Sequence, residues 1–305
     1  MTILLIPADL AGQRLDSVAA RISGYSRSRV AELIAAGEVT LDSKVVTKPA
    51  TPVAGGELLE FRHEPRPTEP TFQPRTVAGM RIVAEDPHIV VVDKPAGVAA
   101  HPSLGWDGPS VTEHLAASGV AIATSGAPER QGVVQRLDVG TTGLMVLAKS
   151  EVAYSRLKQA FRDRNVSKVY HALAQGRLDP FVGTIDAPIG RHPRAEWKMA
   201  IVSPGRSSIT HYQTLAAYRE ASLLEIKLET GRTHQIRVHL SSVGHPCCGD
   251  DLYGCDPKLA ARLGLQRQWL HAVSLGFEHP ATGDWVEFES AYPADLAAAL
   301  RIVSD

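Results

Sequence analysis

The chain has 305 residues, of which 44% are hydrophobic and 21% are charged, and its formal net charge is -1. This composition excludes a disordered tail, a fibrous protein and a small disulfide-stapled domain. At about 100 to 200 residues per domain, the length predicts two domains. The near-neutral net charge neither favours nor excludes nucleic acid, because such binding depends on a local basic face.

The sequence shows no sign of export or of membrane insertion. It has no run of about 18 apolar residues, and residues 1–7 lack the basic flank and length of a signal peptide. The three cysteines are an odd number, and Cys247 and Cys248 are neighbours that cannot pair easily. We therefore expect a cytoplasmic protein with no disulfide and no membrane partner.

The first 62 residues predict a small domain that combines helices and strands. Apolar residues recur at helical spacing over 15–22 and 28–37, and Gly37 is a natural stop for the second helix. Short β-rich pieces follow at 38–41, 44–46 and 58–61. Residues 63–76 hold four prolines within ten residues and predict an extended linker.

Residues 77–305 predict a larger α+β domain. Apolar runs at 89–93 and 144–148 predict buried strands, and 151–161 predicts a helix. Strand-like segments dominate afterwards, at 169–173, 207–213, 222–228 and 285–288. The pattern indicates a mixed, mainly antiparallel sheet and not a regular βαβ array.

Four segments of this domain carry charged residues or glycines within strand-like sequence, which is typical of a functional site. They are residues 93–98, 135–144, 167–172 and 229–240. Asp138 is the best candidate carboxylate, although without the family resemblance a turn cap or an ion pair with Arg136 is the more common explanation of such a residue. If 229–240 is a strand, Gln235, Arg237 and His239 share one face, which fits either a cleft or a solvated edge strand.

Three other patterns bear on function. His245, Cys247, Cys248 and Cys255 lie close in sequence, but adjacent cysteines cannot easily reach one ion, so we expect no metal site. The phosphate-binding glycine motifs of nucleotide-binding folds are absent. Five basic residues, Arg156, Lys158, Arg162, Arg164 and Lys168, predict either a solvated helix face or an edge that contacts the phosphates of a polyanion.

The motifs together resemble the RluA/RluD-type family of RNA pseudouridine synthases over nearly the whole chain. Lys94-Pro95-Ala96-Gly97, Arg136-Leu137-Asp138 with 141–144, Lys168-Val169-Tyr170, and 231–240 through Asp250 follow the order of the family motifs. Residues 12–62 resemble the small RNA-binding domain of ribosomal protein S-four. The resemblance implies the pseudouridine synthase fold after an RNA-binding domain, with 1–62, 63–76 and 77–305 as domain, linker and catalytic domain.

The resemblance also implies site roles. Asp138 would be the essential carboxylate, Tyr170 would stack on the target uracil, and Arg237 would pair with Asp138. The remaining expected RNA-binding residues are Lys94, Arg136, Thr141, Lys168, Arg232, His234 and Gln235. The implied substrate is structured RNA, above all 23S ribosomal RNA of the large subunit, with no cofactor or metal and with a monomeric enzyme.

Two departures from the family pattern define the alternatives. Gln135 stands where members usually have His, and Thr142 stands where they usually have Ser. Gln135 motivates the alternative of a non-catalytic RNA-binding or ribosome-assembly factor with the same fold. A third function, hydrolysis of a glycosidic bond, needs a second carboxylate about 5 to 9 Å from the first.

Overall fold

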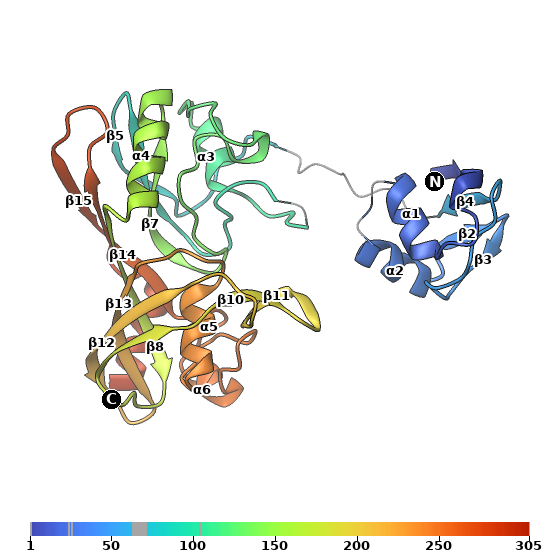
Figure 1. The fold of residues 1–305 in the computed structure, drawn as a ribbon. Coiled ribbons are helices and arrows are strands. Elements are labelled where there is room, and N and C mark those ends of the chain that lie inside the picture. Colours follow the sequence, from blue (N-terminus) through green and yellow to red (C-terminus); the bar gives the residue numbers. More distant parts are fainter. Residues whose placement is uncertain (1, 24, 26, 63–71, 104, 305) are drawn as a thin grey trace. The chain divides into compact units, whose positions relative to one another are not determined.

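The computed structural model describes residues 2–23, 25, 27–62, 72–103 and 105–304, and it divides into two compact units, Met1–Thr71 and Phe72–Asp305 (Figure 1). The expected linker lies largely at 63–71, outside the described residues. Its last residues belong to the second unit, because the Gln73 amide donates to Glu113 and Arg75 forms an ion pair with the same carboxylate at 3.3 Å.

The first unit packs two helices against a four-stranded antiparallel sheet. Its elements are β1 (Thr2–Leu5), a 3-10 turn (Ala8–Leu10), α1 (Leu15–Ser23), α2 (Arg27–Ala35), β2 (Val39–Leu41), β3 (Lys44–Val45) and β4 (Leu58–Phe61). The strand order is β1-β4-β2-β3. The predicted helices and strands are confirmed, whereas β1 had not been predicted. Leu15, Ile34 and Phe61 lie in the core with no exposed surface, so this unit buries its own hydrophobic cluster.

The second unit is built on a nine-stranded sheet. Its strands are β5 (Arg81–Glu85), β6 (Ile89–Lys94), β7 (Thr142–Ala148), β8 (Val166–Gln175), β9 (Val182–Asp186), β12 (Ile209–Ala217), β13 (Ala221–Leu228), β14 (Leu270–Glu278) and β15 (Trp285–Glu289). Their order is β5-β6-β7-β14-β8-β13-β12-β9, with β15 beside β14. The β14–β7 pair is parallel and the other pairs are antiparallel, which confirms the predicted mixed sheet.

Helices and a hairpin surround this sheet (Figure 1). They are α3 (Val111–Ala117), a 3-10 turn (Pro128–Arg130), α4 (Glu151–Asp163), the hairpin of β10 (Ile189–His192) and β11 (Ala195–Ile201), α5 (Gln235–Ser242), α6 (Pro257–Arg262) and α7 (Ala294–Ser304). Among the described residues, no helix has the length and apolar character needed to span a membrane.

The apolar run of β7 is continuous because both faces of the strand are covered. Leu144 and Val146 belong to one hydrophobic cluster, whereas Met145 and Leu147 belong to the other. Successive side chains of a strand point to opposite faces, so two cores require an uninterrupted apolar sequence. Because β7 is anchored on both faces, the turn that precedes it, residues 136–141, has a rigid base.

Residues 229–240 do not form the strand that their alternating polarity indicated. A turn leads into helix α5, in which Gln235, Arg237 and His239 are all buried. The solvated edge strand is therefore wrong, whereas Gln235 and Arg237 do line a cavity, as the alternative of a cleft required. The polar groups tolerate burial because each has internal partners; His239, for example, bonds Thr210 Oγ1 at 2.8 Å and the carbonyl of Ala187 at 3.0 Å.

The burial of His239 makes a pH-dependent contribution to stability. Burial lowers the pKa of His239, partly offset by its bond to the Ala187 carbonyl. Below the unfolded pKa of about 6.5, the unfolded chain binds a proton that the folded chain does not bind. As the pH is lowered below that value, we expect the free energy of unfolding to decrease. The contribution of this residue to the decrease is at most about 1.4 kcal/mol per pH unit. Urea titrations at about pH 5 and pH 7.5 should show a smaller pH effect for His239→Gln; an equal effect would contradict this assignment.

Candidate active site

A small cavity of about 70 Å³ opens where the turn before β7 meets β8 and the turn before α5. Its lining includes candidates from three of the four sequence segments, which places those segments around one site. The lining residues are Arg136, Leu137, Asp138, Thr141, Tyr170, Leu228, Gly231, Arg232, Thr233, His234, Gln235, Ile236, Arg237 and Leu270.

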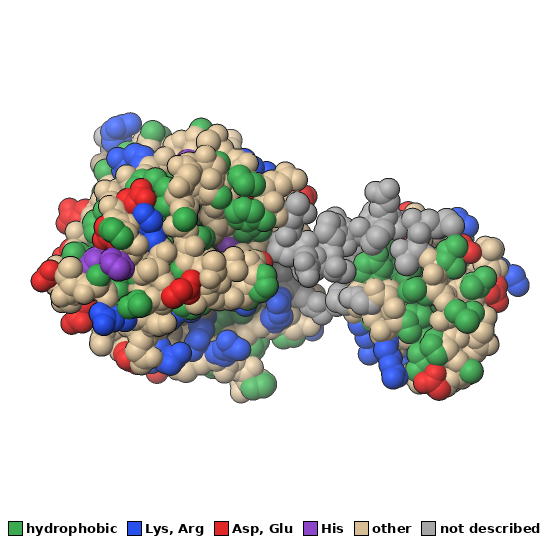
Figure 2. Space-filling view, turned by 90° about the horizontal axis from the view of Figure 1, so that it is seen from above, with side chains coloured by type: hydrophobic (Ala, Val, Ile, Leu, Met, Phe, Trp, Pro, Cys, Tyr) green, Lys and Arg blue, Asp and Glu red, His purple; other side chains and the backbone are tan. Residues whose placement is uncertain are grey.

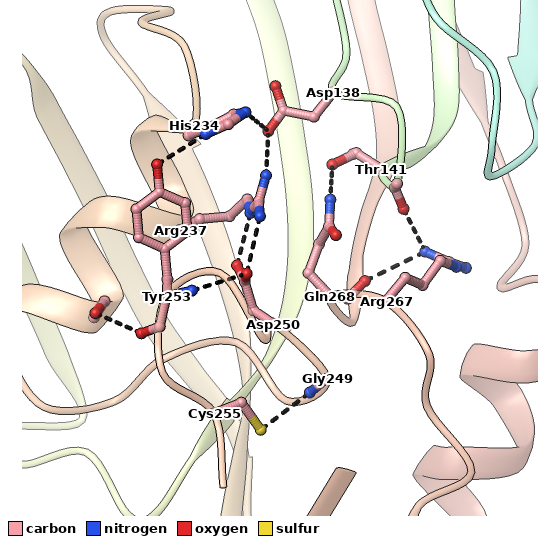
Figure 3. Close-up of polar contacts among 12 residues, drawn as sticks. Asp138, Thr141, His234, Arg237, Gly249, Asp250, Tyr253, Cys255, Arg267 and Gln268 are labelled. Carbon is pink, nitrogen blue, oxygen red and sulfur yellow. Dashed lines mark hydrogen bonds and ion pairs between the residues drawn. The ribbon is translucent and has the colours of Figure 1, made fainter. Parts of the chain in front are cut away.

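Arg237 links two carboxylates at this cavity (Figure 3). Its Nε and Nη2 donate to the two oxygens of Asp250 at 2.6 and 2.9 Å, and its Nη1 donates to Asp138 Oδ2 at 3.4 Å. The guanidinium carbon also lies 4.9 Å from the centre of the Tyr253 ring. Burial alone would lower the pKa of Arg237, but the bonds and charge of Asp250 raise it above its usual value. The guanidinium is therefore a fixed positive charge beside Asp138.

Asp250 is a site residue whose role the sequence did not indicate, although it lies in the last motif. Its side chain is only 1% exposed and accepts hydrogen bonds from two of the three guanidinium nitrogens of Arg237. A signal was present in the sequence, because a buried arginine requires a carboxylate and 249–250 closes the same motif. Composition could not tell which acid provides it.

His234 approaches Asp138 from the other side. Its Nε2 lies 4.0 Å from Asp138 Oδ2, and its Nδ1 bonds the hydroxyl of Tyr253 at 2.8 Å. The backbone of His234 is left-handed, with φ of 56°, and forms the N-terminal cap position of α5. Burial lowers the pKa of His234, while the charge of Asp138 opposes that shift. The turn thus directs the imidazole and the guanidinium toward the same carboxylate oxygen.

The turn that carries Asp138 is stabilised by a hydrogen bond within it and by bonds from Arg267 and Gln268, which precede β14. The Thr141 amide donates to the Asp138 carbonyl at 3.0 Å, and Gln268 Nε2 donates to Thr141 Oγ1 at 3.2 Å. Arg267 donates to the Gly140 carbonyl at 2.8 Å (Figure 3). Thr141, expected to contact RNA, has 2% exposure and a hydroxyl engaged within the protein. Its position favours a structural role in the turn.

Lys94 lies beneath this turn and does not line the cavity. It has no exposed surface, and its ammonium donates to the carbonyls of Pro95, Val98 and Val139 at 3.0, 2.8 and 3.2 Å. Burial is the main cause that lowers the pKa of Lys94, to about 7. The expectation that Lys94 contacts RNA is therefore wrong, because a side chain with no exposed surface cannot reach RNA. Instead, Lys94 holds the backbone next to Asp138 in place.

The other expected RNA-binding residues lie in different places. Arg136 and Arg232 line the cavity, and Lys168 lies in an adjoining one. Gln235 also belongs to the lining, but it is 3% exposed and its amide bonds Thr230, the Arg232 amide, Ile209 and Thr210. Because these bonds occupy its amide, Gln235 organises the turn and is not available to RNA.

The departure at Thr142 has a structural explanation. Its hydroxyl bonds Nδ1 of the buried His271 at 2.7 Å. A serine hydroxyl would reach the same partner, so the change keeps the bond and adds a methyl group within a strand buried along its full length.

Tyr170 is the aromatic side chain of the cavity. It is 8% exposed, and burial together with the charge of Asp138 raises the pKa of its hydroxyl well above the usual value. Its phenol is therefore neutral at physiological pH, and its ring offers a planar apolar surface next to the carboxylate.

Tyr170→Phe keeps the aromatic ring and removes the hydroxyl, so it tests the two groups separately. We expect the variant to fold and to bind RNA as the wild type does, while turnover falls about 10²-fold if the hydroxyl takes part in proton transfer. Single-turnover product formation checks the predicted loss of turnover. Equilibrium RNA binding, measured on the same preparation, checks the predicted unchanged affinity. Wild-type turnover would remove the hydroxyl from the reaction and leave only the ring.

The three cysteines belong to the protein core. All three cysteines are free and buried. Among the described residues, no cluster of three or more His, Cys, Asp or Glu side chains is arranged to hold a metal ion. The cysteines pack as small core residues, as the sequence indicated.

The fold and this carboxylate site define the class of protein. A family model for RNA pseudouridylate synthases matches residues 88–242, and a model for the S4 domain matches residues 13–59. The chain belongs to the RNA pseudouridylate synthase family and is therefore an isomerase. The expected family, fold class and enzyme class are confirmed.

Similar proteins cover most of the chain. An uncharacterized RNA pseudouridine synthase of Mycobacterium bovis is 56% identical over 298 residues, covering 98% of this chain and 96% of its own. Ribosomal large subunit pseudouridine synthase D of Pseudomonas aeruginosa is 40% identical, covering 98% and 94%. Among solved structures, human RNA Pseudouridylate Synthase Domain Containing 4 is similar with a TM-score of 0.58 at 27% identity, covering 73% and 92%.

Proposed function

We propose that this enzyme converts uridine to pseudouridine in ribosomal RNA of the large subunit, with Asp138 as the essential carboxylate. The reaction breaks the bond from ribose to ring nitrogen 1 and forms a bond from ribose to ring carbon 5. Carbon 5 loses its proton and nitrogen 1 gains one, so the conversion needs no redox change and no external reactant. The observation that carries the proposal is Asp138 held by Arg237 in a cavity that Tyr170 also lines. The similar proteins named for the large ribosomal subunit support the choice of RNA.

Each residue of the cavity has a role in this proposal. A carboxylate can attack the nucleoside or stabilise positive charge that develops on the sugar. Arg237 holds Asp138 in one orientation, which reduces the need to order it during the reaction, and His234 Nε2 lies 4.0 Å from the same carboxylate oxygen. The Tyr170 ring restrains the detached uracil, and Arg136, exposed at the rim, occupies the space left when the target nucleotide is flipped out.

The geometry disfavours glycoside hydrolysis, which needs a second carboxylate that is free to act. The carboxylate that shares Arg237 with Asp138 is Asp250, and both of its oxygens are bound to the guanidinium. With only 1% of its side chain exposed, Asp250 cannot activate a water at the cavity. Isomerisation uses a single carboxylate and therefore fits the site better.

Mapping of pseudouridine in ribosomal RNA tests the proposal. RNA from a strain that lacks the protein is compared with RNA after complementation by wild type or by Asp138→Asn. Discrete sites should disappear in the deletion strain and return only with wild type, which would also identify the target uridine. Unchanged ribosomal RNA, followed by tight RNA binding without product in vitro, would favour the non-catalytic RNA-binding factor instead.

We further propose that the enzyme acts in the cytoplasm as a monomer. The three free, buried thiols suit a reducing compartment. Asp138, Tyr170 and Arg237 of the same chain meet at the catalytic cavity, which suits a monomeric enzyme. Light scattering of the purified protein at micromolar concentration would detect a dimer and so contradict the monomer.

A further inference from the structure

A second, larger cavity of about 470 Å³ adjoins the catalytic one. The two linings have five residues in common, so a ligand can extend from one cavity into the other; these are Arg136, Tyr170, Leu228, Gly231 and Arg232. The larger cavity lies between the C-terminal half of α4, β8 and the segment that leads to Asp138. Nothing in the roles proposed for Asp138, Tyr170 and Arg237 uses this space.

The lining of the larger cavity carries an excess of positive charge. Besides Arg136, its basic side chains are Arg130, Lys158, Arg162, Arg164, Lys168 and Arg232. The carboxylate in the lining, Glu229, already bonds Arg164 at 2.6 Å and His211 at 2.8 Å. Figure 2 shows Lys and Arg side chains gathered near one edge of the larger unit.

The lysines of this cavity are held in an environment that disfavours their charge. Burial lowers the pKa of Lys168, and burial together with Arg130 and Arg162 lowers the pKa of Lys158. Cations that are crowded and partly desolvated are stabilised when an anion enters among them. The charge of the cavity therefore fits phosphate groups.

Gln135 adds a second, independent observation. Its Nε2 is buried and has no hydrogen-bond partner, although the residue lies in the lining of the cavity. A buried donor without an acceptor is costly, so its presence indicates an acceptor that binds there. Phe161, which is partly exposed, lies in the same lining, with the Lys168 ammonium 5.8 Å from the centre of its ring.

We propose that this cavity binds the nucleotide next to the target uridine in the substrate RNA. Its phosphodiester lies among the basic side chains, and an acceptor atom of its base receives the hydrogen bond from Gln135 Nε2. The inference rests on the proposed function, because the catalytic cavity holds the target. Gln135, the departure that suggested a lost activity, thus becomes a residue that reads the neighbouring base.

An abasic scan combined with a Gln135 variant tests this contact. The Asp138→Asn protein, which cannot turn over under the proposed function, is titrated with transcribed fragments of large-subunit ribosomal RNA to find the tightest fragment. Synthetic copies of that fragment then lack one base at a time. The same copies are bound to Asp138→Asn/Gln135→Ala, so that each pair of affinities forms a thermodynamic cycle.

The expected result is a coupling at one position. Gln135→Ala should weaken binding of the intact fragment by about 5- to 10-fold. It should weaken binding by less than about 2-fold when the base beside the target uridine is absent. Equal losses on every abasic copy, or no loss on the intact one, would overturn the proposal.

Matched lysine variants test the phosphate contact. Lys168→Met should weaken binding and reduce its salt dependence by about one counterion. Lys227→Met is the control, because Lys227 is on neighbouring β13, is 63% exposed and pairs opposite Val169, on the face of the sheet away from Lys168. If the slope of binding affinity against salt concentration were unchanged in Lys168→Met, Lys168 would not contact a phosphate and the proposed phosphate contact would be contradicted.

Turnover on the intact fragment distinguishes the two proposals. Wild type without product, but with the coupling at Gln135, would contradict the proposed reaction and keep the second nucleotide site. Product formation without the coupling would support the proposed reaction and contradict the second nucleotide site.

Discussion

We expect Asp138→Asn to reduce pseudouridine formation by about 10⁴-fold or more while RNA affinity stays within a few-fold of wild type. The amide keeps the shape of the side chain and the acceptor oxygen that Arg237 Nη1 reaches at 3.4 Å. It removes the negative charge and the nucleophilicity that the reaction requires. Because Asp138 is partly exposed at the rim and Arg237 remains paired with Asp250, the fold should be unaffected.

The measurement is single-turnover conversion of a large-subunit ribosomal RNA fragment, with binding measured on the same samples. Asp251→Asn is the matched control, because it makes the same chemical change on an exposed residue outside the cavity. The control should keep wild-type turnover. Turnover by Asp138→Asn within about tenfold of wild type would show that another group performs the reaction.

The catalytic turn could be recognised from sequence because its signals are local. A charged stretch followed at once by the apolar strand β7 indicated that Asp138 stands at the edge of a core, and the structure has that arrangement. The helices of the first unit were also predictable, since their apolar spacing and stop signals lie within a few residues of one another.

Residue patterns alone could not predict the partners of the site, because these partners come from distant elements. Gln268 meets Thr141 across 127 residues, and Arg237 meets Asp138 across 99, a pairing that only the family resemblance implied. Helix α5 was not predicted, because a buried arginine and histidine resemble an exposed polar face of a strand when their acceptors are unknown. Lys94 was misassigned for a related reason, since three backbone carbonyls can satisfy an ammonium that looks free in the sequence.

Replacing Arg237 by Met is expected to have the largest effect on stability. Asp250, with a side chain only 1% exposed, would lose both of its guanidinium bonds and remain a buried charge with a single bond from the Tyr253 amide. Loss of one partner from a buried pair costs about 3 to 5 kcal/mol of unfolding free energy. Turnover should be lost as well, because Asp138 loses the group that orients it.

A second variant separates stability from catalysis. Arg237→Met/Asp250→Asn removes the stranded charge, so its unfolding free energy in urea should exceed that of Arg237→Met, while its turnover stays low. Arg232→Met is the control for loss of a nearby cation, and its unfolding free energy should change by less than about 1 kcal/mol because its side chain is partly exposed. A stable and fully active Arg237→Met protein would contradict the pairing of Arg237 with both carboxylates. If the double variant regained turnover together with stability, the effect of Arg237 on the reaction would come from folding alone, and Asp138 would need no cationic partner.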